Sequence, residues 1–313
     1  MLLVPTSRDR GSYEEFRDHP PVGDPPFALG RGLEIVALDY ALSELIFNAC
    51  DPRGHFHFMA RQFSCRYAFR VEHSPEEERH ERWDPENIIY EAVALSRLAR
   101  DNAYSTEYAA RVVEYENGEL SVRPFDGDLS RYAYSLGQDR DWLDAEGAAN
   151  LAALLAVFWS DEHELPERVR DALWLTERLT HEHFVDIAVP GLVAALERLI
   201  STSKEQVTRQ FKTRVPELAK ELGVPGVSRT LCGQIYAARS QGAHGSAIDL
   251  LAAPRADANV QKVAKMQTVL HAAVRRAIED PAFRAVLADD AAIRSRWPVA
   301  VPHRWLRWRR RIL

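Results

Sequence analysis

Cysteine is scarce in this sequence of 313 residues, and long apolar runs are absent. The three cysteines, Cys50, Cys65 and Cys232, are odd in number, far apart and in no metal-ligand spacing, which predicts reduced, buried thiols. The apolar start Met1–Val4 meets Pro5 at once and is too short for a signal-peptide core. No apolar run approaches the roughly 18 residues that a membrane span needs. We therefore expect a cytoplasmic protein with no membrane partner.

Signatures of nucleotide and metal chemistry are also lacking. The chain contains neither a P-loop nor a G-x-G-x-x-G fingerprint. His55 and His57 form an H-x-H pair without a third ligand in sight. His181 and His183 lie two positions apart on a predicted helix, so their side chains diverge. We expect neither a metal nor a cofactor.

The composition is that of a soluble globular protein, with 46% hydrophobic and 27% charged residues, and the length suits two domains. The net charge of −6 conceals an asymmetry, because the last twenty residues contain seven arginines and no acidic residue. Without those seven arginines the rest of the chain carries −13. An acidic body is therefore followed by a basic tail.

The N-terminal half is predicted to be a small α+β domain over residues 33–160, after an irregular lead-in over residues 1–32 that is rich in proline and glycine. Hydrophobic periodicity and turn residues indicate its elements. These are a helix over Leu33–Ala49, a half-buried strand over Phe63–Glu72, a helix over Pro85–Arg100, a hairpin around Asn117-Gly118, and an Ala- and Leu-rich helix over Leu143–Trp159.

A polar break at residues 160–166 precedes a series of helices over residues 166–290, which predicts an up-and-down helical bundle. The expected landmarks are a kink or break at Pro190, a capping box at Ser203–Gln206, an interruption at Pro216, a helix stop at Gly223, a helix start near Ser228, and a last helix from about Asp257 to Asp280. The fold class is thus mainly α, with a C-terminal bundle preceded by a smaller α+β domain. Residues 291–313 form a basic tail rich in Trp and Arg.

The stretch 235–245 is the main candidate for chemistry. Arg239 and His244 lie five positions apart, where helical residues give way to glycines. A permanently charged guanidinium and an imidazole that titrates near neutrality suit phosphodiester cleavage without a metal. On an ideal helix the two would point about 140° apart. We expect Gly242 to end the helix in a left-handed turn, so that His244 folds back toward Arg239.

Residues 236–245, with Tyr236, Arg239, Ser240, His244 and Gly245 in order, resemble the Tyr-x-x-Arg-Ser-x-x-x-His-Gly form of the ApeA-like branch of the HEPN superfamily. Upstream, Ala195-Leu196-Glu197-Arg198-Leu199 resembles the acidic first-helix segment of that branch. The resemblance covers roughly residues 166–290. It implies a HEPN-like bundle that forms a homodimer and acts as a metal-independent endoribonuclease on tRNA or mRNA. It also implies prokaryotic antiphage defence or a toxin-like system.

The resemblance implies that a ribose 2′-hydroxyl attacks the adjacent phosphorus and leaves a cyclic phosphate and a 5′-hydroxyl. In this scheme His244 exchanges the proton and Arg239 holds the phosphate. As supporting roles, Ser240 donates a hydrogen bond, Glu197 orients Arg239 or His244, and Tyr236 stacks on a base. The N-terminal domain would sense a trigger or restrain the nuclease, and a regulatory or antitoxin protein is a candidate partner.

Alternatives stay open at each point. Arg239 and His244 also suit a helix-end ion pair or cap, as in a non-catalytic HEPN scaffold that dimerises and binds RNA or protein. A second alternative is an enzyme that transfers a group by means of its N-terminal domain. In the tail, Arg304, Trp305, Arg307 and Trp308 suit single-stranded RNA, whereas the same tryptophans would also anchor a final helix on the body.

Overall fold

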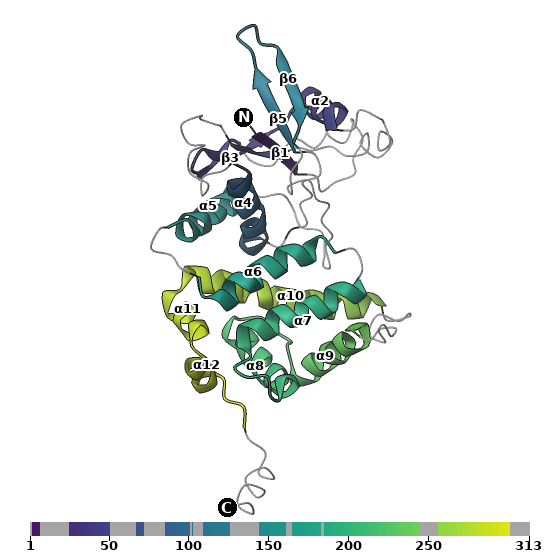
Figure 1. Ribbon diagram of the computed structural model, residues 1–313, viewed down its shortest axis with the longest axis vertical. Coiled ribbons are helices and arrows are strands. Elements are labelled where there is room, and N and C mark those ends of the chain that lie inside the picture. The colour runs from purple at the N-terminus through teal and green to yellow at the C-terminus, as the bar shows by residue number, and fades with distance from the viewer. Residues whose placement is uncertain are drawn as a thin grey trace, which may run out of the picture. The chain divides into compact units, whose positions relative to one another are not determined.

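The computed structural model describes residues 2–6, 25–50, 67–71, 85–100, 102, 109–125, 144–160, 165–182, 185–243 and 256–300. The chain forms two compact units (Figure 1). The first comprises Met1–His163 and Thr180–His183, and the second comprises Glu164–Leu179 and Phe184–Leu313. The protein is mainly helical, with a sheet in the first unit, as the sequence predicts.

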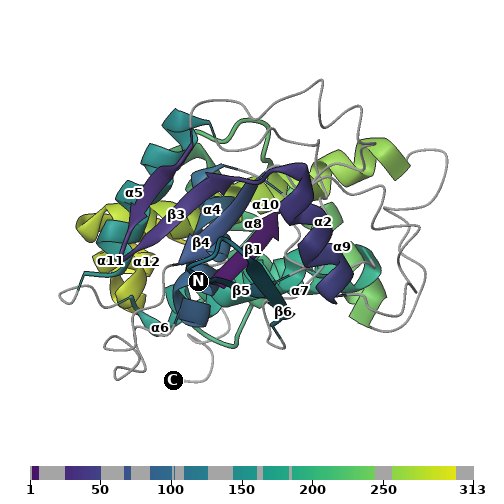
Figure 2. The same cartoon turned by 90° about the horizontal axis from the view of Figure 1, so that it is seen from above.

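The first unit contains a six-stranded antiparallel sheet in the order β2-β3-β4-β1-β5-β6. Its strands are β1 (Leu2–Thr6), β2 (Phe27–Gly30), β3 (Leu33–Ala37), β4 (Tyr67–Val71), β5 (Ala110–Glu114) and β6 (Leu120–Pro124). Among the described residues, three helices pack on it: α2 (Tyr40–Cys50), α4 (Pro85–Ala99) and α5 (Ala145–Phe158). Figure 2 shows the sheet with α4 and α5 beneath it.

Both faces of the sheet are covered, which the sequence pattern alone did not indicate. The residues of β4 that the predicted alternation places in the core, Tyr67, Phe69 and Val71, are buried. Ala68 is buried as well, because it belongs to a core cluster with Ile46 of α2. The prediction of a half-buried strand is therefore wrong for the described part of β4, since a helix supplies the second cover.

Two further N-terminal predictions are wrong. The lead-in contains strand β1, which pairs with the distant β4, and strand β2, which pairs with the neighbouring β3, so it is not irregular throughout. The predicted helix over Leu33–Ala49 is divided: Leu33–Ala37 is strand β3, and the helix begins only at Tyr40. The turn between β2 and β3 has positive φ angles at Gly30, Arg31 and Gly32, which makes a hairpin that the helical periodicity obscured.

Other N-terminal predictions are confirmed. Helix α4 matches the predicted helix over Pro85–Arg100, and α5 matches the predicted Ala- and Leu-rich helix. The Asn117-Gly118 hairpin joins β5 and β6, with Gly118 at φ +79° and a 2.9 Å backbone hydrogen bond from Tyr115 to Glu119. A glycine is favoured at such a positive φ because it lacks Cβ.

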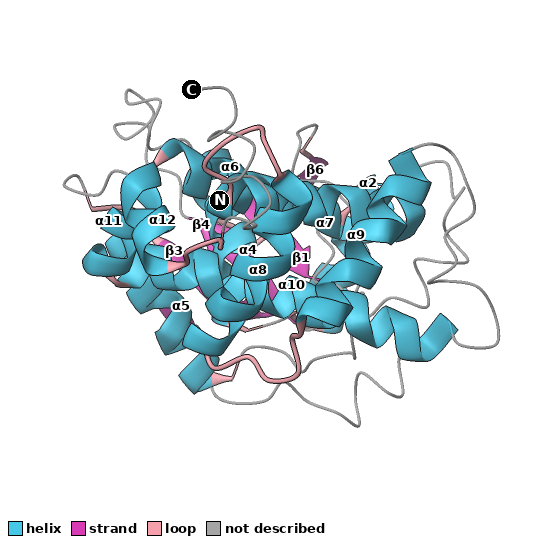
Figure 3. Ribbon diagram, turned by 90° about the horizontal axis from the view of Figure 1, so that it is seen from below, coloured by secondary structure: helices cyan, strands magenta, loops and turns pink. Residues whose placement is uncertain are grey.

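The second unit is helical (Figure 3). Its elements are α6 (Glu167–Thr180), α7 (Val185–Ile200), α8 (Val207–Glu221), α9 (Arg229–Ala243), α10 (Ala256–Glu279), α11 (Pro281–Ala288) and α12 (Asp290–Arg296). Helix α7 contacts α8, α9 and α10 and buries Val189, Val193 and Leu196 completely. This apolar face gives the unit its core.

Several predicted landmarks of the second unit need correction. The first break comes between α6 and α7, whereas Pro190 lies inside α7 and Pro216 lies inside α8. A proline removes one helical hydrogen bond, and burial of the neighbouring Val189 and Leu192 stabilises the helix here. The capping box is also wrong, because α8 starts after Gln206 in a left-handed conformation without a side-chain cap.

The helix stop at Gly223 is confirmed, with φ +71° and a 2.9 Å hydrogen bond from the Val224 N–H to the Ala219 carbonyl. The end of α10 before Asp280-Pro281 is also confirmed. Within the described residues, no helix combines the length and the apolar character that crossing a membrane requires.

Candidate functional site

Helix α9 carries the arginine of the predicted motif. Its start is fixed by Ser228, as predicted, because the Ser228 Oγ accepts a 3.1 Å hydrogen bond from the Leu231 N–H. Cys232, Ile235 and Ala238 form its buried face. Arg239 follows Ala238 directly and lies at the edge of this face. Since α9 packs closely on α7, the arginine is held near the acidic side of that helix.

Arg239 lies beside Glu197 of α7, as the resemblance implied. Its Nη2 is 3.6 Å from Glu197 Oε2. A charge-assisted hydrogen bond is about 2.7–2.9 Å long, so this contact is a loose ion pair. The Arg239 side chain is 36% exposed and that of Glu197 is 13% exposed. The guanidinium therefore has a counterion on one side and an accessible surface on the other.

Tyr236 forms part of the support of Arg239. The Arg239 Cζ lies 5.4 Å from the centre of the Tyr236 ring, within cation–π range. The same ring packs against the fully buried Phe211 of α8, with 5.4 Å between ring centres and an interplanar angle of 60°. Three helices thus position the arginine: α9 carries it, α7 supplies its counterion, and α8 supports the ring beneath it.

Ser240 and Gly242 of the motif lie within the described residues, whereas its last two residues do not. Ser240 is exposed on α9. Gly242 is helical within α9, so the prediction that it ends the helix in a left-handed turn is wrong. A helix can continue through a glycine at modest cost when its flanking residues are good helix formers, as Ala237, Ala238 and Ala243 are. His244 and Gly245 lie outside the described residues.

Glu197 also borders a pocket that the sequence did not reveal. The pocket has a volume of about 460 Å³ and is lined by residues 166–168 at the start of α6, 197–198 at the end of α7, the turn 201–204, and Ala288 and Asp290. These segments are far apart in the chain, and no sequence motif joins them. The spacing of residues within one segment does not indicate which distant segments it contacts, so the sequence could not predict this pocket.

Cys232 lies on α9, seven positions before Arg239, but its surroundings do not suit a reactive thiol. Its side chain is fully buried, and burial raises the pKa of the thiol to about 12. The thiolate is the nucleophilic form, so this cysteine is a packing residue.

The tail and the histidine pairs fall mostly outside the described residues. Arg304, Trp305, Arg307 and Trp308 lie there, as do His55 and His57. Trp297 is described: it is 3% exposed and packs edge-on against Phe283, with 6.2 Å between ring centres. In the part of the chain that the structure describes, no three His, Cys, Asp or Glu side chains are grouped to hold a metal ion.

No family model, curated protein or solved structure matches the chain. The resemblance to HEPN proteins therefore rests on the motif residues of the sequence.

Proposed function

We propose that this protein is a metal-independent endoribonuclease of the HEPN type, with Arg239 and His244 as its catalytic residues. The environment of Arg239 is the observation that carries the proposal. Its guanidinium is held at 3.6 Å from Glu197 and over the Tyr236 ring, yet more than a third of its side chain is open. A fixed, accessible guanidinium suits the recognition of a phosphate.

The reaction needs a proton transfer and a means of neutralising charge. The ribose 2′-hydroxyl loses its proton and forms a bond to the adjacent phosphorus. The bond from phosphorus to the 5′-oxygen breaks, and that oxygen gains a proton. The products are a cyclic phosphate and a 5′-hydroxyl. His244 exchanges the proton, a contribution of about 10²–10⁴-fold, while Arg239 stabilises the negative charge on the phosphate oxygens.

Glu197 and Tyr236 act as positioning residues in this proposal, because both contact Arg239. Ser240, which is exposed next to Arg239, donates a hydrogen bond to the substrate. Two copies of the chain pair through the helices of the second unit, so that two motifs line one cleft. The first unit restrains or triggers the nuclease in a prokaryotic defence or toxin-like system.

The test is cleavage of a pool of tRNA and mRNA in EDTA by wild type, Arg239→Ala and His244→Ala. We expect cleavage by wild type and a loss of about 10²-fold or more in each variant. Arg229→Ala is the matched control, since Arg229 is an exposed arginine at the start of the same helix. It should cleave as wild type does.

Cleavage that requires a divalent metal, or that survives both substitutions, would overturn the proposal. If neither the full chain nor its second unit cleaves RNA, and both dimerise and bind RNA, the non-catalytic scaffold is the correct function. The Arg239–Glu197 pair would then be a tether between two helices.

A further inference from the structure

Two residues that line the pocket beside Arg239, Glu197 and Ser201, each carry a buried polar atom without a partner among the described residues. Glu197 Oε1 and Ser201 Oγ are both buried, and neither has a hydrogen-bond partner among the described residues. Glu197 lies in the last turn of α7, and Ser201 directly follows the helix with its N–H bonded to the Glu197 carbonyl at 2.8 Å, so the two side chains lie on the same side of the helix axis. Buried polar groups in folded proteins are nearly always hydrogen-bonded, and an exception in a pocket points to a ligand or water.

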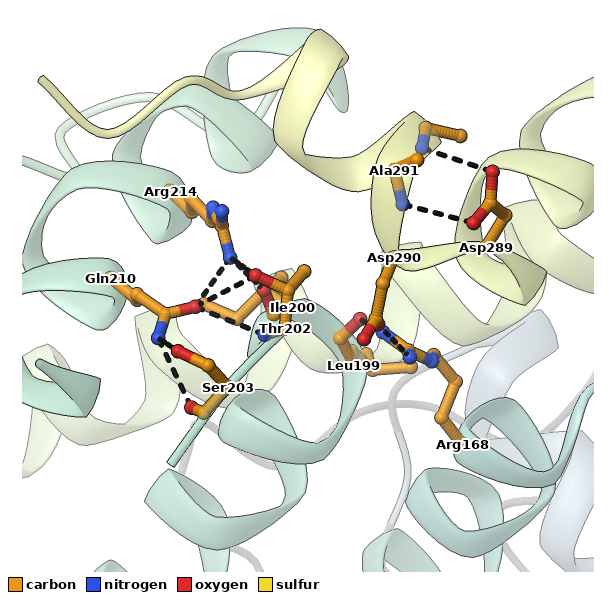
Figure 4. A network of polar contacts seen from close by, with 11 residues as sticks. Arg168, Leu199, Ile200, Thr202, Ser203, Gln210, Arg214, Asp289, Asp290 and Ala291 are labelled. Carbon is orange, nitrogen blue, oxygen red and sulfur yellow. Dashed lines mark hydrogen bonds and ion pairs between the residues drawn. The ribbon is translucent and has the colours of Figure 1, made fainter. Parts of the chain in front are cut away.

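The turn that closes this pocket is fixed by buried side chains of α8 (Figure 4). Gln210 Oε1 accepts a 3.0 Å hydrogen bond from the Thr202 N–H, and Gln210 Nε2 donates to the Ser203 carbonyl at 3.1 Å. Arg214 donates to the Ile200 carbonyl at 2.7 Å. Gln210 and Arg214 are only 4% and 3% exposed. These hydrogen bonds fix the conformation of the turn 201–204 without a ligand.

The opposite wall is fixed in a similar way. Arg168 donates to Asp290 Oδ1 at 2.6 Å and to the Leu199 carbonyl at 3.3 Å, as Figure 4 shows. Arg198 is neutralised by Asp171 and Glu167, each at 2.6 Å. Both arginines of the pocket thus have carboxylate partners. They shape the pocket, and their charge is already balanced.

Three groups are left to bind a ligand. Glu197 Oε1 accepts hydrogen bonds, Ser201 Oγ can accept or donate, and the exposed Lys204 has no ion-pair partner among the described residues. A matching ligand donates hydrogen bonds at one end and carries negative charge at the other. A ribonucleotide does both, because carboxylates accept hydrogen bonds from ribose hydroxyls and an ammonium group binds phosphate. The volume lies within the range of about 300–1,000 Å³ that is usual for ligand pockets.

We propose that this pocket binds one ribonucleotide unit of RNA, with the ribose hydroxyls at Glu197 and Ser201 and the phosphate at Lys204. The choice of ligand class rests on the proposed function. Glu197 contacts both sites, since its other oxygen pairs with Arg239. The pocket therefore lies one side chain away from the proposed catalytic arginine and anchors the strand beside it. The 2′-hydroxyl also lets the pocket distinguish RNA from DNA.

The experiment is a titration of the full chain in EDTA with AMP, CMP, GMP and UMP and with their 2′-deoxy counterparts, followed by NMR or calorimetry. We expect wild type to bind the ribonucleotides about tenfold or more tightly than the deoxy forms. Glu197→Gln and Ser201→Ala should lose this preference. Lys204→Gln should weaken both sugar forms to the same extent, by about tenfold.

Matched controls separate binding from folding. Thr208→Ala and Lys220→Gln change exposed residues of α8 that do not line the pocket, and they should bind as wild type does. Ser201→Ala should fold as stably as wild type, because the Ser201 Oγ has no partner to lose. A melting curve by circular dichroism checks this.

The outcomes distinguish the pocket from the nuclease. Ribonucleotide binding that persists in Arg239→Ala, with cleavage lost, supports both proposals. Ribonucleotide binding by a wild type that never cleaves RNA supports the pocket and overturns the nuclease. Absence of binding, equal binding of ribo and deoxy forms, or wild-type binding by Ser201→Ala would overturn the pocket, whatever the cleavage assay shows.

Discussion

Arg239 differs from Arg168 and Arg198 of the same unit in how its charge is used. Arg168 and Arg198 donate to carboxylates at 2.6–2.7 Å and serve to join segments. The ion pair of Arg239 with Glu197 is 3.6 Å long, and its contact with the Tyr236 ring is electrostatic, with no hydrogen bond. The guanidinium N–H groups of Arg239 can therefore donate hydrogen bonds to a ligand. An arginine that binds phosphate needs this property.

Cys232 should be inert in the native protein. Burial raises the pKa of its thiol from 9.0 to about 12, so the thiolate is rare at pH 8. We expect alkylation by iodoacetamide to be about a thousandfold slower than in the unfolded chain. Peptide mass spectrometry after timed alkylation at pH 8, in buffer and in guanidinium chloride, gives the two rates. Rapid labelling of native Cys232 would contradict the packing described for α9.

Glu221 should stabilise the second unit in a pH-dependent way. Burial raises the pKa of its carboxyl, but hydrogen bonds from Arg296 and Trp297 and the charge of Arg276 outweigh burial, so the folded pKa is below the usual value. A carboxyl of this kind contributes stability above its unfolded pKa of about 4.3, and the contribution is lost as pH falls through the folded pKa.

Glu221→Gln should therefore lower the free energy of unfolding by about 1.5–3 kcal/mol at pH 7, the usual value of hydrogen bonds to a charged group. The difference from wild type should shrink below about pH 4. Urea denaturation at pH 7, 5 and 3 measures it. Glu217→Gln, at an exposed position of the same helix, should be neutral, and a constant difference across pH would contradict this assignment.

At the level of helices, α8 supports the site from below through Phe211. Phe211→Leu removes ring contact with Tyr236 and should lower the free energy of unfolding by about 1–3 kcal/mol. Cleavage should fall by about tenfold or more, because small shifts of a catalytic group are costly. Phe283→Leu makes the same change at a buried site on α11. Equal loss of cleavage in both variants would show a general effect of stability.

The elements that could be predicted are those whose signals are local. The Asn117-Gly118 turn, the Gly223 stop and the Ser228 cap each depend on one residue and its immediate neighbours. Strand β3 could not be predicted, because Leu33–Ala37 fits helical and strand patterns equally and only its pairing with β4 decides. The local cost of a proline in a helix predicts a break at Pro190. The helix continues there because tertiary packing overrides this cost.

The candidate site also has features that local sequence predicts and features that it does not. The place of Arg239 late in a helix follows from local periodicity, and its proximity to Glu197 was implied by the family resemblance. The role of Phe211 and the pocket beside Glu197 carry no local signal. They arise where segments of α6, α7, α8 and the 288–290 region meet, which only the folded chain defines.

On the scale of the whole molecule, the division into two units predicts separable roles. A fragment of residues 164–313 contains every described contact of Arg239 and the whole pocket. We expect this fragment to fold on its own and to cleave RNA in EDTA at least as fast as the full chain. Circular dichroism and the same cleavage assay test this. A folded fragment that is inactive beside an active full chain would mean that the first unit contributes to catalysis.

The most direct test of the nuclease is whether the 2′-hydroxyl at the cut is the nucleophile. Once a cleavage site is mapped, an all-ribose oligonucleotide is compared in EDTA with one that carries a single 2′-deoxy sugar on the 5′ side of that bond. We predict that the first is cut to a cyclic phosphate and a 5′-hydroxyl, and that the second stays intact at that bond. Cleavage of the deoxy bond, or products with a 5′-phosphate, would contradict the roles given to Arg239 and His244.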